Sequence, residues 1–194
     1  MSIESRTIGL KEAINEIASA CGRDARKNFV FIVGAGISNP PVPLASEITA
    51  HCRDKARQDN PEVSEPSTGK VGNDYSHWFN QAYPHPQQRR KYLEGLIKGK
   101  PLSPASLRLA HVLMTNQVAD TVITPNFDDF VSRALALFGE TNFSLCDHPR
   151  ITDRIDSEEH DIKVVHVHGS YRIYDLANIE EELKNALYLR PRLR

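Results

Sequence analysis

The chain has 194 residues, a length that suits one domain with a hydrophobic core and is too short for two domains of ordinary size. Its 24 lysines and arginines nearly balance 25 aspartates and glutamates, so a net charge of −1 excludes a strong global attraction to nucleic acid or an anionic membrane. The cysteines, Cys21, Cys52 and Cys146, are isolated, and no stretch approaches the roughly 18 apolar residues of a membrane span. We therefore expect a cytoplasmic protein with no membrane segment or export signal.

The first two predicted elements form the N-terminal part of the chain. Residues 10–20 carry Ile14, Ile17 and Ala18 at helical spacing among charged residues, which predicts an amphipathic helix. Residues 29–33 are all β-branched or aromatic and are followed by a glycine. This pattern predicts a central strand in a parallel sheet that is covered on both faces.

Helical and loop patterns fill the stretch before the next predicted strand. Residues 44–56 are expected to form a helix, and residues 60–74 are rich in loop-forming residues. Residues 75–99 are polar and are expected to be helical in part. We therefore predict a helical insertion over about residues 44–116.

The last helix of this stretch has clear signals at its start. Ser103 is an N-cap candidate and Pro104 suits the first helical position, which predicts a helix over residues 104–115. One stripe of this helix is expected to face the core: Leu107, Ala110, His111 and Met114.

Two further apolar runs, residues 120–124 and 162–167, are predicted strands. An amphipathic helix follows the first of them and extends through Phe138, and residues 143–146 are a candidate for a short additional strand. Strands that alternate with helices predict the α/β class. We expect a Rossmann-like parallel sheet flanked by helices, with the helical insertion between its first two strands.

Ligands of open α/β sheets bind beyond the carboxyl ends of the strands, and three predicted strand ends carry unusual residues. The first end leads into the loop Gly34-Ala35-Gly36-Ile37-Ser38. Its glycines favour a tight turn and close approach of backbone amides to a phosphate, and Ser38 can donate a hydrogen bond. The loop lacks the third glycine of the usual dinucleotide fingerprint, so a plain strand-to-loop turn stays the alternative for this loop alone.

The second strand end runs into Thr124-Pro125-Asn126-Phe127-Asp128. One interpretation is helix capping, in which Asn126 or Asp128 accepts hydrogen bonds from free amides of the next helix. The other is that Asn126, held by the rigid proline, orients a hydroxyl or a water in the crevice. Both interpretations can hold for different side chains.

The third strand end carries His166 and His168, followed by Gly169 and Ser170. Residues two apart on a strand share a face, so a zinc site is one interpretation. We disfavour it because no cysteine, carboxylate or third histidine is spaced to complete the shell, and we expect no metal ion. We instead expect one packed histidine, with His168 as the candidate acid or base.

The three motifs, in this order, resemble the sirtuin family: Gly-Ala-Gly-Ile-Ser, then Thr-x-Asn-x-Asp, then His-Gly-Ser after a strand. In that family the first loop binds the dinucleotide, the asparagine lies beside the nicotinamide ribose, and the histidine is a general base toward the ribose hydroxyls. The resemblance implies catalytic roles for Asn126 and His168, together with Asp128. It implies NAD contacts for the remaining motif residues: Gly34, Ala35, Gly36, Ile37, Ser38, Thr124, Gly169 and Ser170.

The chain also departs from the protein-deacylating sirtuins. Those proteins continue the first loop with Gly-Ile-Pro-Asp-Phe-Arg, where this chain has only Val42-Pro43-Leu44, and it lacks their paired Cys-x-x-Cys zinc motifs. The chain is similar instead to divergent sirtuin-like domains of bacterial anti-phage systems, including those associated with short prokaryotic Argonautes, which hydrolyse NAD. The resemblance spans residues 29–170 and is dense only around the motifs. It implies an effector that depletes cellular NAD in defence against phages and plasmids.

Family members continue with further strands after the histidine, whereas this chain ends at Arg194. Either the sheet is completed in an unusual way or residues 1–194 are the N-terminal part of a longer polypeptide. We favour the second, because a sheet of three predicted strands leaves an edge that needs cover. The resemblance then implies a partner such as a short Argonaute, bound through a region beyond this chain. It also implies contact with nucleic acid only through that partner, and a homo-oligomer on activation.

The expected reaction is hydrolysis of the bond between nicotinamide and ribose in NAD, which gives nicotinamide and ADP-ribose. The enzyme has to hold the ribose, stabilise an oxocarbenium-like transition state and deliver water. We expect Asn126 to position the ribose hydroxyls or the water and His168 to act as general base. Asp128 is expected to orient this arrangement or stabilise positive charge, unless capping is its only role. Two other functions stay open: a non-catalytic module that senses NAD or ADP-ribose or assembles with partners, and, less favoured, an NAD-dependent protein deacylase.

Overall fold

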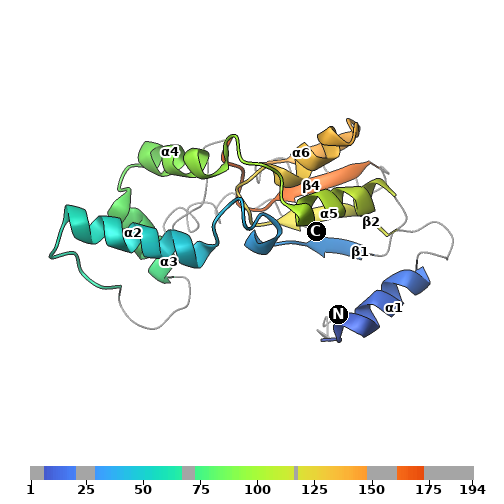
Figure 1. Cartoon of the computed structure of the whole chain (residues 1–194), viewed down its shortest axis with the longest axis horizontal. Coiled ribbons are helices and arrows are strands. Elements are labelled where there is room, and N and C mark those ends of the chain that lie inside the picture. Colours follow the sequence, from blue (N-terminus) through green and yellow to red (C-terminus); the bar gives the residue numbers. More distant parts are fainter. Residues whose placement is uncertain (1–6, 21–28, 67–72, 116–117, 148–160, 173–194) are drawn as a thin grey trace, which may run out of the picture.

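A computed structural model describes residues 7–20, 29–66, 73–115, 118–147 and 161–172. Four strands form one parallel sheet in the order β1-β2-β4-β3 (Figure 1). Their bounds are Phe29–Ile32 for β1, Ala119–Thr124 for β2, Phe143–Cys146 for β3 and Ile162–His166 for β4. The predicted α/β class with a Rossmann-like parallel sheet is confirmed, and the candidate strand at residues 143–146 is part of it.

The strand register brings three strand ends to the same edge of the sheet. Thr124, the last residue of β2, pairs with His166, the last residue of β4. Ile32 of β1 pairs with Ile123 of β2, one residue earlier. The loops that follow β1, β2 and β4 therefore leave the sheet side by side, as expected for parallel strands.

Two helices, α5 (Pro104–Met114) and α6 (Phe130–Leu137), cover one face of the sheet and pack against each other (Figure 1). The buried apolar residues of this layer are Leu109, Ala110, Leu113, Ala119, Val122, Val131, Ala134, Leu135, Ile162 and Val164. Burial of these apolar side chains is the main contribution to the stability of the sheet layer.

The start of α5 agrees with the sequence prediction, but its buried stripe differs. The Ser103 side chain accepts a hydrogen bond from the backbone amide of Ser106 at 3.0 Å, so Ser103 is the N-cap. The prediction was wrong for His111, which is exposed. Ser106 is buried on the core side instead, because its hydroxyl donates to the Ser103 carbonyl at 2.8 Å and is thereby satisfied.

Three helices, α2 (Ala45–Asp59), α3 (Asn73–Ala82) and α4 (Pro86–Ile97), pack around a second core. Its buried residues are Ile48, Cys52, Ala56, Trp78, Phe79, Ala82 and Leu93. The predicted insertion of about residues 44–116 includes α5, which the structure places on the sheet. The inserted unit is therefore α2–α4, and it lies beside the carboxyl ends of the strands (Figure 1).

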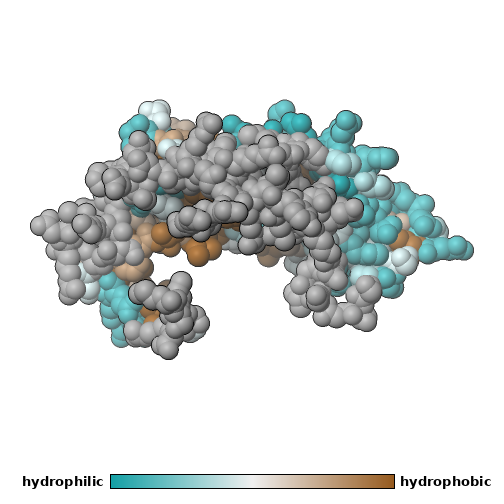
Figure 2. Space-filling model, turned by 180° about the vertical axis from the view of Figure 1, so that it is seen from behind, coloured by the Kyte–Doolittle hydropathy of each residue, from teal (hydrophilic) through white to brown (hydrophobic). Residues whose placement is uncertain are grey.

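The strand β1 is covered on one face only by the described residues. Phe29 and Phe31 pack against the sheet core, whereas Val30 is 53% exposed and Ile32 is 79% exposed. Seen from behind, this side of the molecule shows hydrophobic surface (Figure 2). The prediction of a central strand covered on both faces was wrong, because β1 lies at one edge of the described sheet and these two side chains are exposed.

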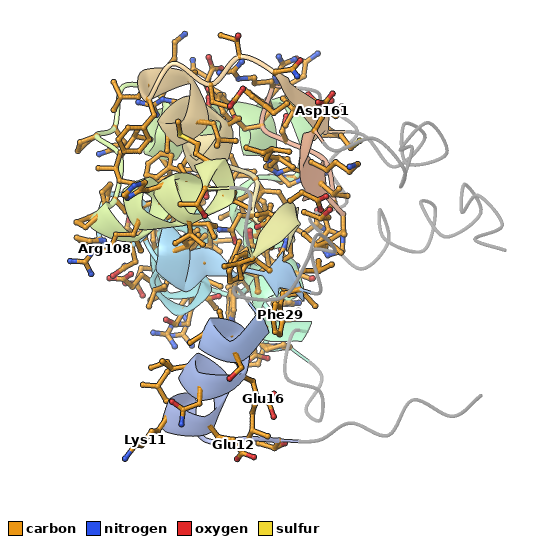
Figure 3. The ribbon with its side chains drawn as sticks, turned by 90° about the vertical axis from the view of Figure 1, so that its right-hand side faces the viewer. Lys11, Glu12, Glu16, Phe29, Arg108 and Asp161 are labelled. Carbon is orange, nitrogen blue, oxygen red and sulfur yellow. The ribbon has the colours of Figure 1, made fainter. Side chains whose placement is uncertain are left out.

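The first helix, α1 (Leu10–Ala20), stands apart from the sheet. Figure 3 shows it projecting beyond the strand that begins at Phe29, with Lys11, Glu12 and Glu16 along its length. Leu10, on its apolar side, is 80% exposed. No helix within the described ranges, α1 included, is long and apolar enough to cross a membrane.

Candidate functional site

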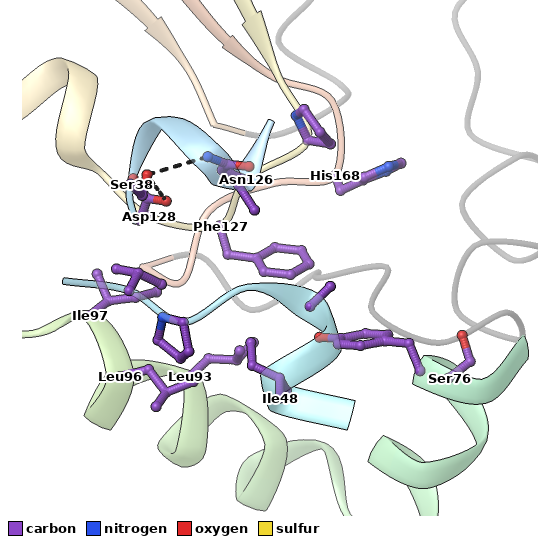
Figure 4. Close-up of a pocket in the computed structure, with 16 residues that line it drawn as sticks. Ser38, Ile48, Ser76, Leu93, Leu96, Ile97, Asn126, Phe127, Asp128 and His168 are labelled. Carbon is purple, nitrogen blue, oxygen red and sulfur yellow. Dashed lines mark hydrogen bonds between the residues drawn. The ribbon is translucent and has the colours of Figure 1, made fainter. Parts of the chain in front are cut away.

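A cavity of about 420 Å³ lies between the carboxyl ends of the strands and the inserted helices. All three sequence motifs contribute to its wall, through Ala35, Ser38, Asn126, Asp128 and His168 (Figure 4). The remaining wall comes from Val42, Pro43, Ala45, Ile48, Tyr75, Ser76, Leu93, Leu96, Ile97, Pro125 and Phe127. Ligands of open α/β sheets bind in this position, so we treat the cavity as the candidate functional site.

The glycine loop after β1 presents open backbone at the edge of this cavity. It contains a single 3-10 turn, Ala35–Ile37. Gly34 has a φ of −102°, which any residue can adopt, so the tight turn expected at this position does not require glycine. A Cβ atom added at Gly34 or Gly36 would meet nothing within 4 Å, so the backbone is open at both positions.

Ser38 turns away from solvent and is only 1% exposed. Its hydroxyl donates to the Oδ2 atom of Asp128 at 2.7 Å, a bond that links two loops 90 residues apart in sequence. The hydroxyl hydrogen is therefore used within the protein. The structure gives Ser38 a role in holding Asp128, where the sequence suggested donation to a phosphate.

Asp128 is buried and connects the first two motifs. Besides the bond from Ser38 to Oδ2, its Oδ1 accepts a hydrogen bond from the backbone amide of Phe130 at 3.1 Å, at the start of α6. Burial raises the pKa of Asp128 above the ordinary value, and both hydrogen bonds oppose this rise. Asp128 thus caps a helix and lines the cavity with the same side chain.

Asn126 belongs to the cavity through its side-chain amide. Its Nδ2 atom donates to the Gly34 carbonyl at 3.1 Å and to the Ser38 Oγ atom at 3.4 Å. These bonds run to the glycine loop and not to α6, so the structure does not support the capping interpretation for Asn126. They leave its Oδ1 atom as the acceptor that a ligand can use.

The two histidines have different environments. His166 is 3% exposed, and its Nδ1 donates to the Asn126 carbonyl at 2.9 Å, because a carbonyl can only accept. His168 is half-buried and lines the cavity, and burial lowers its pKa below the ordinary value. Figure 4 shows its imidazole beyond Asn126, pointing away from Ser38 and Asp128. The structure thus packs one histidine of the pair and leaves His168 at the cavity.

Several residues predicted to contact NAD do not line the cavity: Gly34, Gly36, Ile37, Thr124, Gly169 and Ser170. Thr124 is buried, and its hydroxyl donates to the Val33 carbonyl at 2.8 Å and accepts from the Asn126 amide at 3.1 Å. Gly169 has a φ of +81° and forms the turn after His168. The Ser170 hydroxyl is buried and has no hydrogen-bond partner in the described part of the chain. Thr124 and Gly169 therefore shape the backbone of the site.

The apolar wall of the cavity was not predicted from the sequence. Leu93 and Ile97 of α4 and Ile48 of α2 are buried there, and Leu96 is partly buried. Their spacing is that of any amphipathic helix, so the sequence carries no signal that they face a cavity. Pro125 and Phe127, on either side of Asn126, also line the cavity, and their positions in the second motif pointed to the site.

No group of histidine, cysteine, aspartate or glutamate side chains within the described ranges has the arrangement of a metal site. Cys52 and Cys146 are buried and free, and Cys21 lies outside the described residues. The polar side chains that line the cavity are the carboxylate of Asp128, the amide of Asn126 and the imidazole of His168, together with the hydroxyl-bearing side chains of Ser38, Tyr75 and Ser76.

The fold and the cavity together define an α/β protein with a Rossmann-like parallel sheet and a candidate ligand site at the carboxyl ends of its strands. No protein-family model matches the chain, and a search of curated proteins found no match.

Proposed function

We propose that this protein hydrolyses NAD to nicotinamide and ADP-ribose. One observation carries the proposal: Asn126, Asp128 and His168, from two different strand ends, lie on the wall of one cavity with Ala35 of the glycine loop. An amide that orients hydroxyls and a neutral imidazole that accepts a proton are the groups that this reaction needs.

The reaction breaks the bond between the pyridinium nitrogen and the anomeric carbon of ribose. The bonding electron pair goes to nicotinamide, which leaves as a neutral molecule, so no strong general acid is required. Water then bonds to the anomeric carbon and loses a proton, and the products are nicotinamide, ADP-ribose and one proton. His168 serves as the base, because its lowered pKa keeps the imidazole neutral near pH 7.

In this proposal, Asn126 and Asp128 contribute by orienting other groups in the site. The Nδ2 bonds to Gly34 and Ser38 hold the Asn126 amide, and its Oδ1 then accepts from a ribose hydroxyl or from the attacking water. Asp128 orients this arrangement through Ser38. The apolar wall of α2 and α4 keeps water away from one side of the cavity and suits a flat ring.

Purified protein is incubated with NAD, and nicotinamide and ADP-ribose are quantified by chromatography. Both products are expected in equal amounts, and N126A and H168A should each abolish them. N15A and H111A are matched controls on exposed positions of α1 and α5, and they should keep full activity. Full activity in both N126A and H168A would place the site elsewhere.

The same purified protein distinguishes NAD hydrolysis from the two other functions, a sensing module and a protein deacylase. A sensing module binds NAD or ADP-ribose in calorimetry without releasing nicotinamide. A deacylase releases nicotinamide only when acylated peptide is added. In the cell, we infer from the resemblance to anti-phage sirtuin-like domains that the reaction depletes NAD under the control of a partner such as a short Argonaute, with assembly into a homo-oligomer.

A further inference from the structure

Two adjacent carboxylates, Asp128 and Asp129, are both buried and bind different loops. Asp128 accepts from Ser38 of the glycine loop. The Oδ2 atom of Asp129 accepts from the Tyr171 hydroxyl at 3.1 Å and from the Arg172 guanidinium. The second motif therefore holds the first motif with one carboxylate, and the segment after the third motif with the other.

The segment that carries His168 is fixed to the second motif on its N-terminal side. His166 donates from Nδ1 to the Asn126 carbonyl at 2.9 Å, and the Val167 amide donates to the Thr124 carbonyl at 3.0 Å. Both bonds come from residues immediately before His168. These two bonds fix the N-terminal side of the turn that contains His168, but they do not fix its C-terminal side.

Asp129 and its partners hold the exit of this turn. The Tyr171 amide donates to the Phe127 carbonyl at 2.8 Å, while its hydroxyl and the Arg172 side chain both bind Asp129. His168 lies between these two anchored segments. His168 is therefore positioned by the chain segments on both sides of it, and not by a described contact of its own side chain.

The Asp129 carboxylate is not used at the start of its own helix. The free amide of Phe130 is already bonded to Asp128, and Asp129 makes no side-chain cap of α6. Asp129 is only 4% exposed, a costly position for a charge unless it is paired. Its Oδ1 lies 3.7 Å from Arg133, and Arg172 completes the pairing at Oδ2. The buried charge of Asp129 is thus paired with Arg172, which follows the turn that contains His168.

We propose that Asp129 is a positioning residue for His168, acting through Tyr171 and Arg172 to hold the turn that places His168 on the cavity wall. The catalytic consequence rests on the proposed NAD hydrolysis, whereas the positioning itself does not. Loss of the Asp129 contacts is expected to displace His168 and to leave the cavity wall formed by Asn126 and the inserted helices in place.

The test compares D129N and Y171F with wild type and with D59N. The control removes an exposed carboxylate at the C-terminal end of α2, whose Oδ2 lies 2.6 Å from the Nζ atom of Lys55. The imidazole signals of His168 are recorded in ¹H–¹⁵N spectra and assigned by their absence in H168A. They should shift in D129N and Y171F and stay in place in D59N, while signals of His111 stay unchanged in all variants.

Steady-state kinetics give the second measurement. In D129N, kcat is expected to fall by about 10- to 100-fold, the loss typical of a catalytic group displaced by about 1 Å. KM should stay near the wild-type value, because the displaced base weakens transition-state stabilisation and not ground-state binding. Y171F removes one hydroxyl and keeps the charge pair, so its loss of kcat should be smaller.

Unmoved His168 signals in D129N overturn the positioning role, whatever happens to the activity. If D129N does not fold, Y171F decides the question in the same spectra, because it removes one hydroxyl and keeps the charge pair of Asp129 with Arg172. Wild-type protein that releases no nicotinamide contradicts the proposed function, and the spectra still decide the role of Asp129.

Discussion

The local environment of each histidine decides which chemistry is open to it. His166 is enclosed by the sheet layer and donates its Nδ1 hydrogen to a backbone carbonyl. His168, two residues later, is only half-buried, and burial lowers its pKa. A neutral imidazole at a cavity wall accepts protons near pH 7, which is what a general base requires.

The pH dependence of NAD hydrolysis should report the titration of His168. Because the base form is active and its pKa is lowered, kcat/KM should rise with pH through a midpoint below about 6.5, the ordinary histidine value. Initial rates across buffers from about pH 5 to 8 measure this limb. H111Q, on the exposed face of α5, should have the same midpoint, and a wild-type midpoint above the ordinary value contradicts the assignment.

Asp128 also titrates on the acidic side, because burial raises its pKa. D128N separates the two groups, since it removes the carboxylate and keeps a side chain of the same size. An acidic limb that persists in D128N belongs to His168, and a limb that disappears belongs to Asp128.

At the scale of elements, turns and helices place opposite demands on glycine. Gly169 has a φ of +81° in the turn after His168, a conformation that side chains with a Cβ disfavour. Gly95 lies within α4, where an added Cβ would meet nothing within 4 Å. The same substitution should therefore have opposite effects on stability at the two positions.

G169A is expected to lower the free energy of unfolding by about 1–2 kcal/mol, because alanine is strained in the left-handed region. G95A is expected to raise it by roughly 0.5–1 kcal/mol, because alanine loses less backbone freedom in a helix. Urea denaturation followed by circular dichroism measures both changes. Equal effects of the two substitutions would show that the turn at Gly169 is not built as described.

At the scale of the whole molecule, the candidate site joins two separate cores. The sheet layer supplies the polar groups at its strand ends, and α2 and α4 supply the apolar wall. Neither part encloses the cavity alone. The helices inserted between β1 and β2 are therefore expected to control which ligand enters.

A bulkier side chain on the apolar wall tests whether the inserted helices control which ligand enters the cavity. Leu96 lines the cavity and is only partly buried, so L96W should project an indole into the space for a ligand. We expect NAD to bind about tenfold or more weakly, a loss of about 1.4 kcal/mol. L137W, at a position that is 68% exposed at the end of α6, is the control and should bind normally in calorimetry. Unchanged affinity in L96W would mean that NAD binds elsewhere.

The positions of strands and helices could be predicted from the sequence because their signals are local. The β-branched and aromatic run at residues 29–33, the apolar run at 162–167 and the Ser103-Pro104 start of α5 each depend on neighbours within a few residues. The order of motifs at strand ends also follows from the alternation of strands and helices. The parallel sheet and the shared edge of its strand ends required nothing more, whereas the strand order that sets Asn126 beside the segment of His168 came from the structure.

Contacts between residues far apart in sequence were decided only by the tertiary structure. Ser38 binds Asp128 across 90 positions and Tyr171 binds Asp129 across 42, and neither pairing has a signal in local spacing. Burial likewise determined that Ser106 and not His111 faces the core, and that helix α4 forms part of the cavity wall. Sequence periodicity states which residues share a face, whereas the packing of one element on another decides what that face meets.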